Sequence, residues 1–462
     1  MIQETPPQQV RDIFNVCKDG FASGKTRSIR WRMEQLHALE RMLSEHEETF
    51  KSALHQDLGK SETEAWLLEI SFVQVACRHV RKHLPKWMRD RRIKVPAFAQ
   101  PGRAWVRPEP LGCILVISPW NYPLQLCLAP LIGAISAGNS VVIKPSELAP
   151  ATSAAIAQLI PEYLDSDCIR VVEGGVETST SLLELNWDHI VFTGGETVAK
   201  VVMTAAAKNL TPVTLELGGK SPCIVLPDAN LDIAARRIAW AKFTNCGQTC
   251  IAPDYILTDP QTAAELIPKL QNEISAMFGD DPATSEDYGR IVNGSHFERL
   301  LSLIGDSKVV IGGQSNFEDR YIAPTVLHPV NEHSLCMQSE IFGPILPVVE
   351  ISGLDQAIEF VRSRPKPLAA YLFSDTEVSR QRVVNEISAG NICLNDLMMF
   401  VSIEDLPFGG VGSSGMGHYN GKSGFDNLSH CKSVLQRSMR PDLKLRYAPA
   451  SKTKLKWLRR LR

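Results

Sequence analysis

A long uncharged segment constrains the fold of this chain more than any other feature. No Asp, Glu, Lys or Arg occurs between Leu111 and Ile143. A membrane-spanning helix needs about 20 continuous apolar residues, but turn-forming residues interrupt this segment at Pro119, Asn121, Pro123, Pro130, Gly133, Gly138 and Asn139. The pieces predict a strand at 112–118, a helix at 124–137 and a strand at 140–144, as in a β-α-β unit buried on both faces.

The same alternation continues along the chain. Helices are predicted at 151–160, 178–184 and 197–207, and strands at 169–172, 189–192 and 213–217. Alternating strands and helices at this spacing indicate a doubly wound parallel sheet, which binds ligands at the carboxyl ends of its strands. Residues 10–83 look helical, a second alternating region spans 221–407, and 86–105 with the residues after 421 fit neither unit.

Composition excludes several classes of protein. The chain has 462 residues, a net charge of -2 and 44% hydrophobic residues, which suits a globular protein of two or three domains with no electrostatic field to attract nucleic acid. Eleven cysteines and a polar start without a signal peptide favour a reduced, cytoplasmic protein. His79 and His83 have the spacing of a metal pair, but basic neighbours favour a solvated face, so no metal site is predicted.

A thiol stands in a turn-like sequence. Cys250 ends the run Asn245-Cys246-Gly247-Gln248-Thr249-Cys250, whose small and polar residues suit an accessible nucleophile. A disulfide or a metal site shared with Cys246 is the alternative, and it ranks lower because the compartment looks reducing and no further ligand lies nearby.

Two other side chains suit catalysis. Glu216 lies at the end of a buried strand, where burial raises a carboxyl pKa towards that of a general base. A capping or salt-bridged role is the alternative. Asn121 follows the strand at 112–118, where its amide can donate to a developing oxyanion or simply occupy a turn.

Two segments suit a nucleotide cofactor. Lys144 and Glu147 follow a strand and place a cation and an acid where they can bind ribose hydroxyls. Gly194 and Gly195 join a strand to a helix, whose N-terminal N–H groups favour a phosphate. Neither segment is the Gly-x-Gly-x-x-Gly fingerprint, so each is weak alone.

Together these segments resemble the aldehyde dehydrogenase superfamily, and most closely its class 3, fatty aldehyde dehydrogenase-like branch. The resemblance covers roughly residues 10–435. It rests on the segments 119–123, 141–147, 192–195, 215–222, 247–254, 340–344, 395–396 and 406–417.

The resemblance implies roles for individual residues. Cys250 matches the nucleophile, Glu216 the general base and Asn121 the oxyanion donor. The matching cofactor residues are Trp120, Lys144, Glu147, Gly194, Gly195, Glu340 and Phe342. The implied cofactor is NAD, NADP or both, and the implied product is a carboxylic acid, formed through a thiohemiacetal and a thioester on the cysteine. Relatives that pass the acyl group to coenzyme A do not carry this glutamate.

The resemblance also implies an α/β fold with a Rossmann-like cofactor domain, an α/β catalytic domain and a small β oligomerisation element. The expected boundaries are 1–85 and 106–217 for the NAD(P)-binding domain and 218–407 for the catalytic domain. Residues 86–105 and 418–440 form the bridging element, and 441–462 a basic tail. Members of this branch are dimers, so a homodimer is expected.

The chain departs from the branch near the substrate. Phe400 and Asn420 stand where many relatives have His. With Tyr122, Met398 and Met399, the side chain of Phe400 is predicted to line a tunnel for medium- or long-chain, aromatic or polyene aldehydes. Ordinary core packing of this loop is the alternative. A semialdehyde substrate is the runner-up, but it needs a cation, and the loop 397–401 has none. An esterase or an inactive relative is a more distant alternative.

The last twelve residues carry basic side chains and no acid. Leu455, Leu458 and Leu461 recur every third residue beside Trp457, a pattern that suits peripheral contact with an anionic membrane. A solvated tail is the alternative.

Overall fold

The first sheet is built from the uncharged region and the alternation that follows it. The computed structural model describes residues 4–305, 307–440, 442, 444 and 447–461. Six strands have the order β17-β7-β6-β3-β4-β5 and are parallel except at β17. Their bounds are β3 Cys113–Ile117, β4 Ser140–Lys144, β5 Ile169–Val171, β6 His189–Thr193, β7 Val213–Glu216 and β17 Gly415–Met416. The predicted doubly wound sheet is therefore confirmed, with strand bounds within one or two residues.

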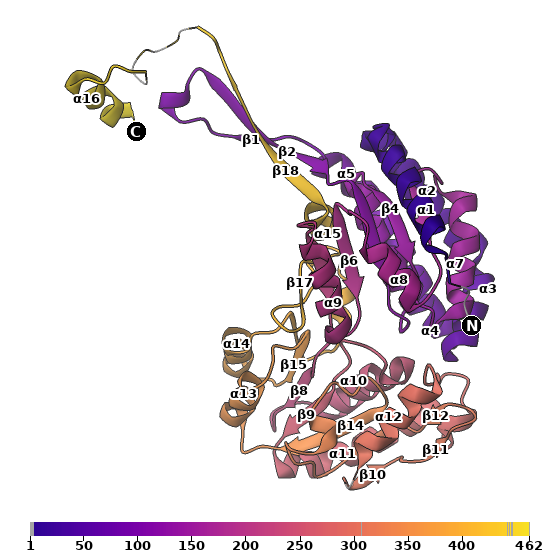
Figure 1. Ribbon diagram of the computed structural model, residues 1–462. Coiled ribbons are helices and arrows are strands. Elements are labelled where there is room, and N and C mark those ends of the chain that lie inside the picture. Colours follow the sequence, from indigo (N-terminus) through magenta and orange to yellow (C-terminus); the bar gives the residue numbers. More distant parts are fainter. Residues whose placement is uncertain (1–3, 306, 441, 443, 445–446, 462) are drawn as a thin grey trace.

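Helices cover both faces of this sheet (Figure 1). Successive residues of a strand point to opposite faces, so Ile114 and Val116 of β3 pack with one set of helices and Cys113 and Leu115 with another. The first set is α2 Ile29–Glu45, α3 Glu47–Leu58, α5 Ser71–Trp87, α6 Gln125–Ala137 and α7 Pro150–Tyr163. The second is α1 Pro7–Ala22, α8 Val176–Leu183 and α9 Glu196–Ala207.

The predicted solvated basic face at His79 and His83 is only partly correct, because Arg78 and Lys82 are exposed but the two histidines pack against other rings. Both side chains are only partly exposed. Their rings lie 4.3 Å apart, and the ring of His83 stacks on that of Trp87 at 5.9 Å. The Trp87 ring of α5 in turn contacts the ring of Phe425, a residue of the hydrophobic core.

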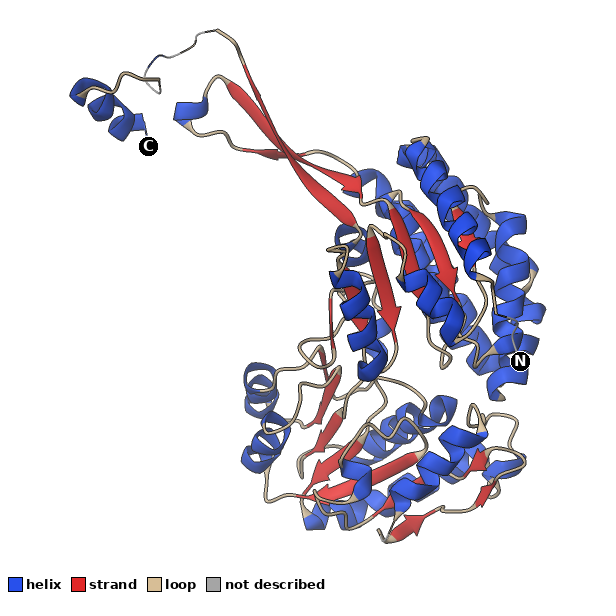
Figure 2. Cartoon of the chain, in the orientation of Figure 1, coloured by secondary structure: helices blue, strands red, loops and turns tan. Residues whose placement is uncertain are grey.

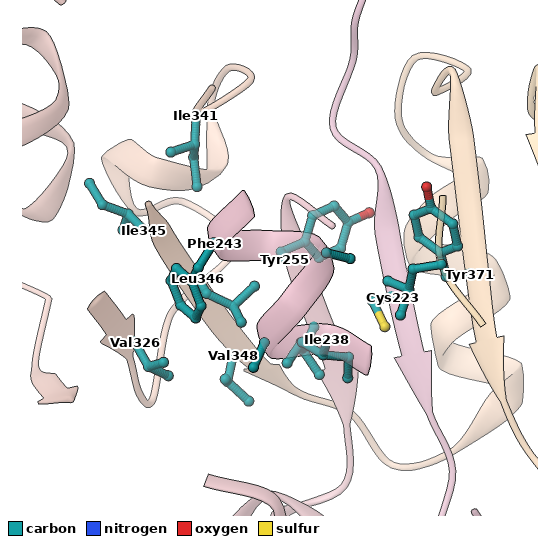
Figure 3. Packing of buried hydrophobic residues seen from close by; sticks show 14 of the residues in the cluster. Cys223, Ile238, Phe243, Tyr255, Val326, Ile341, Ile345, Leu346, Val348 and Tyr371 are labelled. Atoms are coloured by element: carbon teal, nitrogen blue, oxygen red, sulfur yellow. The ribbon is translucent and has the colours of Figure 1, made fainter. Parts of the chain in front are cut away.

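A second sheet forms the lower body of the molecule in Figure 1. Its order is β10-β13-β14-β9-β8-β15-β16. The strands are β8 Pro222–Val225, β9 Tyr255–Thr258, β10 Val309–Ile311, β13 Thr325–Leu327, β14 Ile345–Glu350, β15 Ala369–Phe373 and β16 Asn391–Leu394. The helices are α10 Leu231–Phe243, α11 Pro260–Phe278, α12 Gly294–Ile304, α13 Leu354–Arg362 and α14 Glu377–Glu386. Figure 3 shows how strands and α10 share one apolar core around Ile238, Phe243 and Val348.

A third, antiparallel sheet projects from the body as a narrow arm (Figure 2). It consists of β1 Arg91–Ile93, β2 Gly102–Pro110 and β18 Ser429–Arg437, in the order β1-β2-β18. The helix α15 Gly421–Asn427 connects this arm to the core through Phe425. Strand β2 runs through Val106, where the sequence suggested a domain boundary.

The C-terminal residues form α16 Lys452–Leu461 beyond the tip of the arm (Figure 1). Leu455 and Trp457 are about half exposed, and the guanidinium of Arg460 lies over the Trp457 ring. Arg462 and the side chain of Leu461, which belong to the predicted membrane-contact pattern, lie outside the described residues. Among the described helices, none is long and apolar enough to cross a membrane.

Candidate active site

A cavity of about 230 Å³ lies where the two large sheets approach one another. Its walls include Asn121 after β3, Glu216 at the end of β7 and Cys250 from the loop after α10. The structure thus brings together three side chains that are distant in sequence. Trp120, Gly194, Gly195, Glu340 and Phe342 line the same cavity.

The cysteine turn has an unusual backbone. Asn245, Cys246 and Gly247 all have positive φ angles, of 52°, 51° and 69°. Residues other than glycine rarely adopt this backbone conformation, because it costs energy. Where it occurs, it is found mainly at functional sites. A Cβ on Gly247 would lie 2.3 Å from the carbonyl oxygen of Gly343, so only glycine fits. The tight turn predicted at Gly247 is confirmed.

Cys250 is half-buried and borders the cavity. Burial raises the pKa of its thiol, and the carboxyl groups of Glu340 and Glu216 raise it further. The backbone N–H groups of Cys250 and Ile251 act in the opposite direction. The resting thiol is therefore protonated, and a base must accept its proton. Cys246 is a free, buried thiol like most others, so the suggested disulfide with Cys250 is wrong.

Glu216 is a buried acid without a partner. Its residue is 2% exposed, and among the described residues neither carboxyl oxygen has a hydrogen-bond partner. Burial raises the pKa of Glu216 well above that of an ordinary carboxyl group. A capping or salt-bridging role requires such a partner, so that alternative is wrong. An unpartnered acid facing a cavity is suited to proton transfer.

Asn121 lies in the turn between β3 and α6 and is 2% exposed. Its side-chain Nδ2 donates to the carbonyl oxygen of Gln248 at 3.0 Å. A primary amide has two N–H donors, so one remains for a group bound next to Cys250. Its backbone carbonyl accepts from Asn245 Nδ2 at 2.7 Å. The loops that carry Asn121 and Cys250 are thus joined directly by hydrogen bonds.

Lys144 and Glu147 form the pair predicted for ribose binding. Lys144 ends β4 and is 3% exposed, and its Nζ lies 2.5 Å from Glu147 Oε2. A hydrogen bond from Thr178 lowers the pKa of the nearby Glu4 carboxyl, and the charge of Lys144 adds to this lowering. A cation held in place at the carboxyl end of a parallel strand is suited to a nucleotide.

Gly194 and Gly195 lead into α9. Apart from its own chain neighbours, no heavy atom of the described residues lies within 4 Å of a Cβ built on Gly195, so open space adjoins the helix N-terminus, where a phosphate is favoured. Gly194 N–H donates to the backbone oxygen of Glu216 at 3.0 Å, which links this turn to the buried acid. These residues fit a dinucleotide cofactor.

Glu340 and Phe342 lie on the opposite wall. A Cβ on Gly218 would be 2.0 Å from Glu340 Oε2, so that glycine makes room for the carboxyl group. Burial, with Asp254 nearby, raises the pKa of Glu340 to about 8. Phe342 meets the Trp120 ring edge-on at 5.3 Å. The three predicted residues therefore all line the cavity.

Sequence reasoning missed two residues of this wall. His296 and Arg299, from the start and middle of α12, both line the cavity. The ring of His296 lies 5.0 Å from that of Trp120, and Arg299 donates to the backbone oxygen of Ile341 at 2.9 Å. They lie outside every motif quoted above, and their spacing of three residues on an apolar helix was the only available signal.

The residues predicted for a substrate tunnel are partly brought together. Tyr122, Met398 and Phe400 belong to one buried cluster against which Cys250 packs. The hydroxyl of Tyr122 lies 2.9 Å from Thr249 Oγ1, next to Cys250. Phe400 stacks between Tyr371 and Phe408, at 6.4 and 6.2 Å. Met399 is 47% exposed, so it lies apart from the other three.

Comparison with known sequences gives extensive matches. The aldehyde dehydrogenase family matches residues 1–434. "Aldehyde dehydrogenase, dimeric NADP-preferring" of Canis lupus familiaris is 46% identical over 444 residues, which cover 96% of this chain and 98% of that protein. Aldehyde dehydrogenase family 3 member B1 of Homo sapiens is 46% identical over 449 residues, 97% of this chain and 96% of that protein.

Solved structures have the same fold. The substrate-bound state of Staphylococcus aureus AldH matches with a TM-score of 0.95 and 44% identity, covering 98% of this chain and 99% of that chain. The P. syringae indole-3-acetaldehyde dehydrogenase AldA, in complex with NAD+ and IAA, matches with a TM-score of 0.86 and 28% identity, covering 94% of this chain and 90% of that chain.

Proposed function

The chain belongs to the aldehyde dehydrogenase family, and from that premise we propose that it oxidises hydrophobic aldehydes to carboxylic acids with Cys250 as its nucleophile. The observation that carries the proposal is the shared cavity of Cys250, Glu216 and Asn121. We assign the cofactor to the wall at Trp120, Glu340 and Phe342, together with the pair Lys144 and Glu147 and the turn Gly194-Gly195.

The first chemical step forms a bond between Cys250 Sγ and the aldehyde carbon. The raised pKa of the thiol keeps it protonated at rest, so its proton passes through water to the solvent as the sulfur attacks. The free N–H of the Asn121 amide and the backbone N–H of Cys250 stabilise the oxyanion of the thiohemiacetal. The nicotinamide, when bound, supplies the hydride acceptor.

Loss of hydride leaves a thioester on Cys250, and Glu216 then serves as a general base. Its carboxylate takes a proton from a water molecule, which attacks the thioester carbon and releases the carboxylic acid and the Cys250 thiolate; the thiolate then takes the proton back from Glu216. An acid whose pKa is raised by burial binds a proton more strongly than an ordinary carboxylate, so it is a better base for this step.

For assembly, location and domains we propose the following arrangement. The chain forms a homodimer, which the name of the dimeric relative supports, and uses NAD, NADP or both. It is cytoplasmic and has no nucleic-acid partner. The NAD(P)-binding domain is 1–85 with 106–217, the catalytic domain 218–407 and the bridging element 86–105 with 418–440.

Substrate length tests the tunnel. We propose Tyr122, Met398 and Phe400 as its wall and Met399 as its exposed mouth. Each buried methylene contributes about 0.8 kcal/mol, so kcat/KM for decanal should exceed that for acetaldehyde by about 100-fold or more. Equal values would remove the tunnel, and a preference for a semialdehyde would favour the alternative in which Arg299 holds its carboxylate.

A pair of variants localises the effect. Phe400→Ala should lower the ratio of kcat/KM for decanal to that for acetaldehyde by about tenfold, because a wall of the tunnel is lost. Phe278→Ala is the matched control, since Phe278 is buried in the same cluster but its ring meets that of Tyr288 edge-on. It should lower the melting temperature and leave the ratio unchanged.

We also propose peripheral contact with anionic membranes through the tail 441–462, chiefly its helix α16. Each Lys or Arg near such a surface contributes about 1 kcal/mol. The full chain should float with vesicles containing phosphatidylserine and should not float with neutral ones, and removal of 451–462 should abolish flotation. Flotation that is insensitive to the truncation would contradict this proposal.

A further inference from the structure

Lys60 and Glu69 form an ion pair that solvent does not reach. Both side chains are 0% exposed. Lys60 follows α3, and Glu69 lies in the π-helical turn η2 Trp66–Ile70, between α4 Glu62–Ala65 and α5. Neither residue belongs to the site assigned above. An ion pair buried this completely needs a physical explanation, because removing two charges from water is costly.

The pair holds both ends of the Asn121 turn. Lys60 Nζ donates to the backbone oxygen of Asn121 at 3.1 Å. Glu69 Oε2 accepts from the N–H groups of Leu124 and Gln125 at 2.9 and 3.0 Å, where α6 begins. The Lys60 ammonium also lies 3.9 Å from the centroid of the Tyr122 ring. Within the described part of the chain, the hydrogen bonds that the two side chains make outside the pair all fall in the short segment 121–125.

These contacts determine where the Asn121 side chain lies. The Asn121 carbonyl accepts from Lys60 on one side and from Asn245 Nδ2 on the other, so its backbone is fixed between α3 and the cysteine turn. The side-chain amide, which donates to the carbonyl of Gln248, starts from that fixed backbone. Displacement of a reacting group by about 1 Å can cost two orders of magnitude in rate.

Stability alone does not require these charges. Replacing a buried ion pair with neutral side chains of similar size is often neutral or stabilising. A π-helical turn is likewise uncommon in helices and is frequent at functional sites. A pair that is costly to bury, and whose anchors all fall on one catalytic turn, is explained by what it does for that turn.

We propose that Lys60 and Glu69 are positioning residues for the oxyanion donor, and that they act on catalysis through Asn121. This inference rests on the role of Asn121 in the proposed function. The ion pair fixes the 121–125 turn relative to Cys250, and the Asn121 amide then meets the oxyanion in the required orientation.

A mutant cycle tests this proposal with purified full-length enzyme, decanal and NAD. Asn121→Ala alone should lower kcat by about 100- to 1,000-fold. The double variant Lys60→Met with Glu69→Gln is neutral and keeps an oxygen for Leu124 and Gln125, and it should lower kcat by about 10- to 100-fold with little change in KM for NAD. The triple variant adds Asn121→Ala to these two substitutions. Its kcat should be at most about threefold lower than that of Asn121→Ala alone.

Arg32→Met provides the matched control. Arg32 is a buried cation that donates to the oxygen of Ser136 at 2.8 Å, near the opposite end of α6. Its loss should lower the melting temperature, and any effect on kcat should multiply with that of Asn121→Ala. If the double variant does not fold, Glu69→Gln alone, which changes one atom, takes its place in the cycle.

The outcomes separate the two claims. Two results would overturn the positioning role. One is a double variant with the wild-type kcat. The other is a triple variant whose fold loss in kcat is the product of the losses in the double variant and in Asn121→Ala. A wild-type kcat in Asn121→Ala would overturn the proposed oxyanion donor, and with it the premise of this inference.

Discussion

Replacing Cys250 by alanine is expected to lower kcat/KM for aldehyde oxidation by about four orders of magnitude or more, the scale on which loss of a nucleophile acts in covalent catalysis. The half-buried side chain lines the cavity, so alanine leaves the surrounding fold intact. Steady-state formation of reduced cofactor with decanal measures the activity, and calorimetric binding of NAD checks that the cofactor site is preserved.

Cys223→Ala is the matched control. Cys223 lies in β8 of the second sheet, within its apolar core (Figure 3), and is fully buried. Removing its sulfur should destabilise the fold by about 1 kcal/mol and change kcat/KM by less than about threefold. An active Cys250→Ala variant would contradict the assignment of the nucleophile.

The second large effect is expected at Glu216. Glu216→Gln should lower kcat by about 100- to 10,000-fold, because an amide cannot accept the proton of the attacking water. Glutamine has the shape of the protonated acid that burial favours at rest, so the fold should persist. The first turnover should still give a burst of reduced cofactor. Glu404→Gln is the control, since burial raises the pKa of Glu404 to about 7 as well, away from the cavity.

The pH dependence follows from the same acid. Glu216 must be a carboxylate to act as a base, and burial raises its pKa, so kcat should increase as the pH rises through that value. The acid limb of the kcat profile should thus lie above the range near pH 4 that is typical of an exposed glutamate. Glu216→Gln should lose this limb. A profile that already levels off near pH 4 in the wild-type enzyme would contradict the raised pKa.

Much of the fold could be predicted because its signals are local. The uncharged stretch, broken by Gly and Pro, and the alternation of strands with helices predicted β3, α6 and β4 closely. The antiparallel arm was harder to predict. Its strands β2 and β18 are separated by most of the chain, and no local pattern specifies which distant strand pairs with an exposed edge.

The site was predictable to the extent that its residues lie in recognisable motifs. Cys250, Glu216 and Asn121 were identified before their meeting in one cavity was known. Local sequence did not indicate His296 and Arg299, which reach the cavity only because α12 packs across it. Nor did it indicate the ion pair of Lys60 with Glu69, because partners buried by tertiary packing have no sequence signature.

Mass spectrometry of an acid-quenched Glu216→Gln reaction with decanal and NAD tests the central claim most directly. The enzyme should gain the mass of one decanoyl group, and peptide mapping should place it on Cys250, because the thioester forms but is not hydrolysed. The wild-type enzyme, quenched in the same way, should carry much less of it. An unmodified Cys250, or a decanoyl group on another residue, would contradict the account.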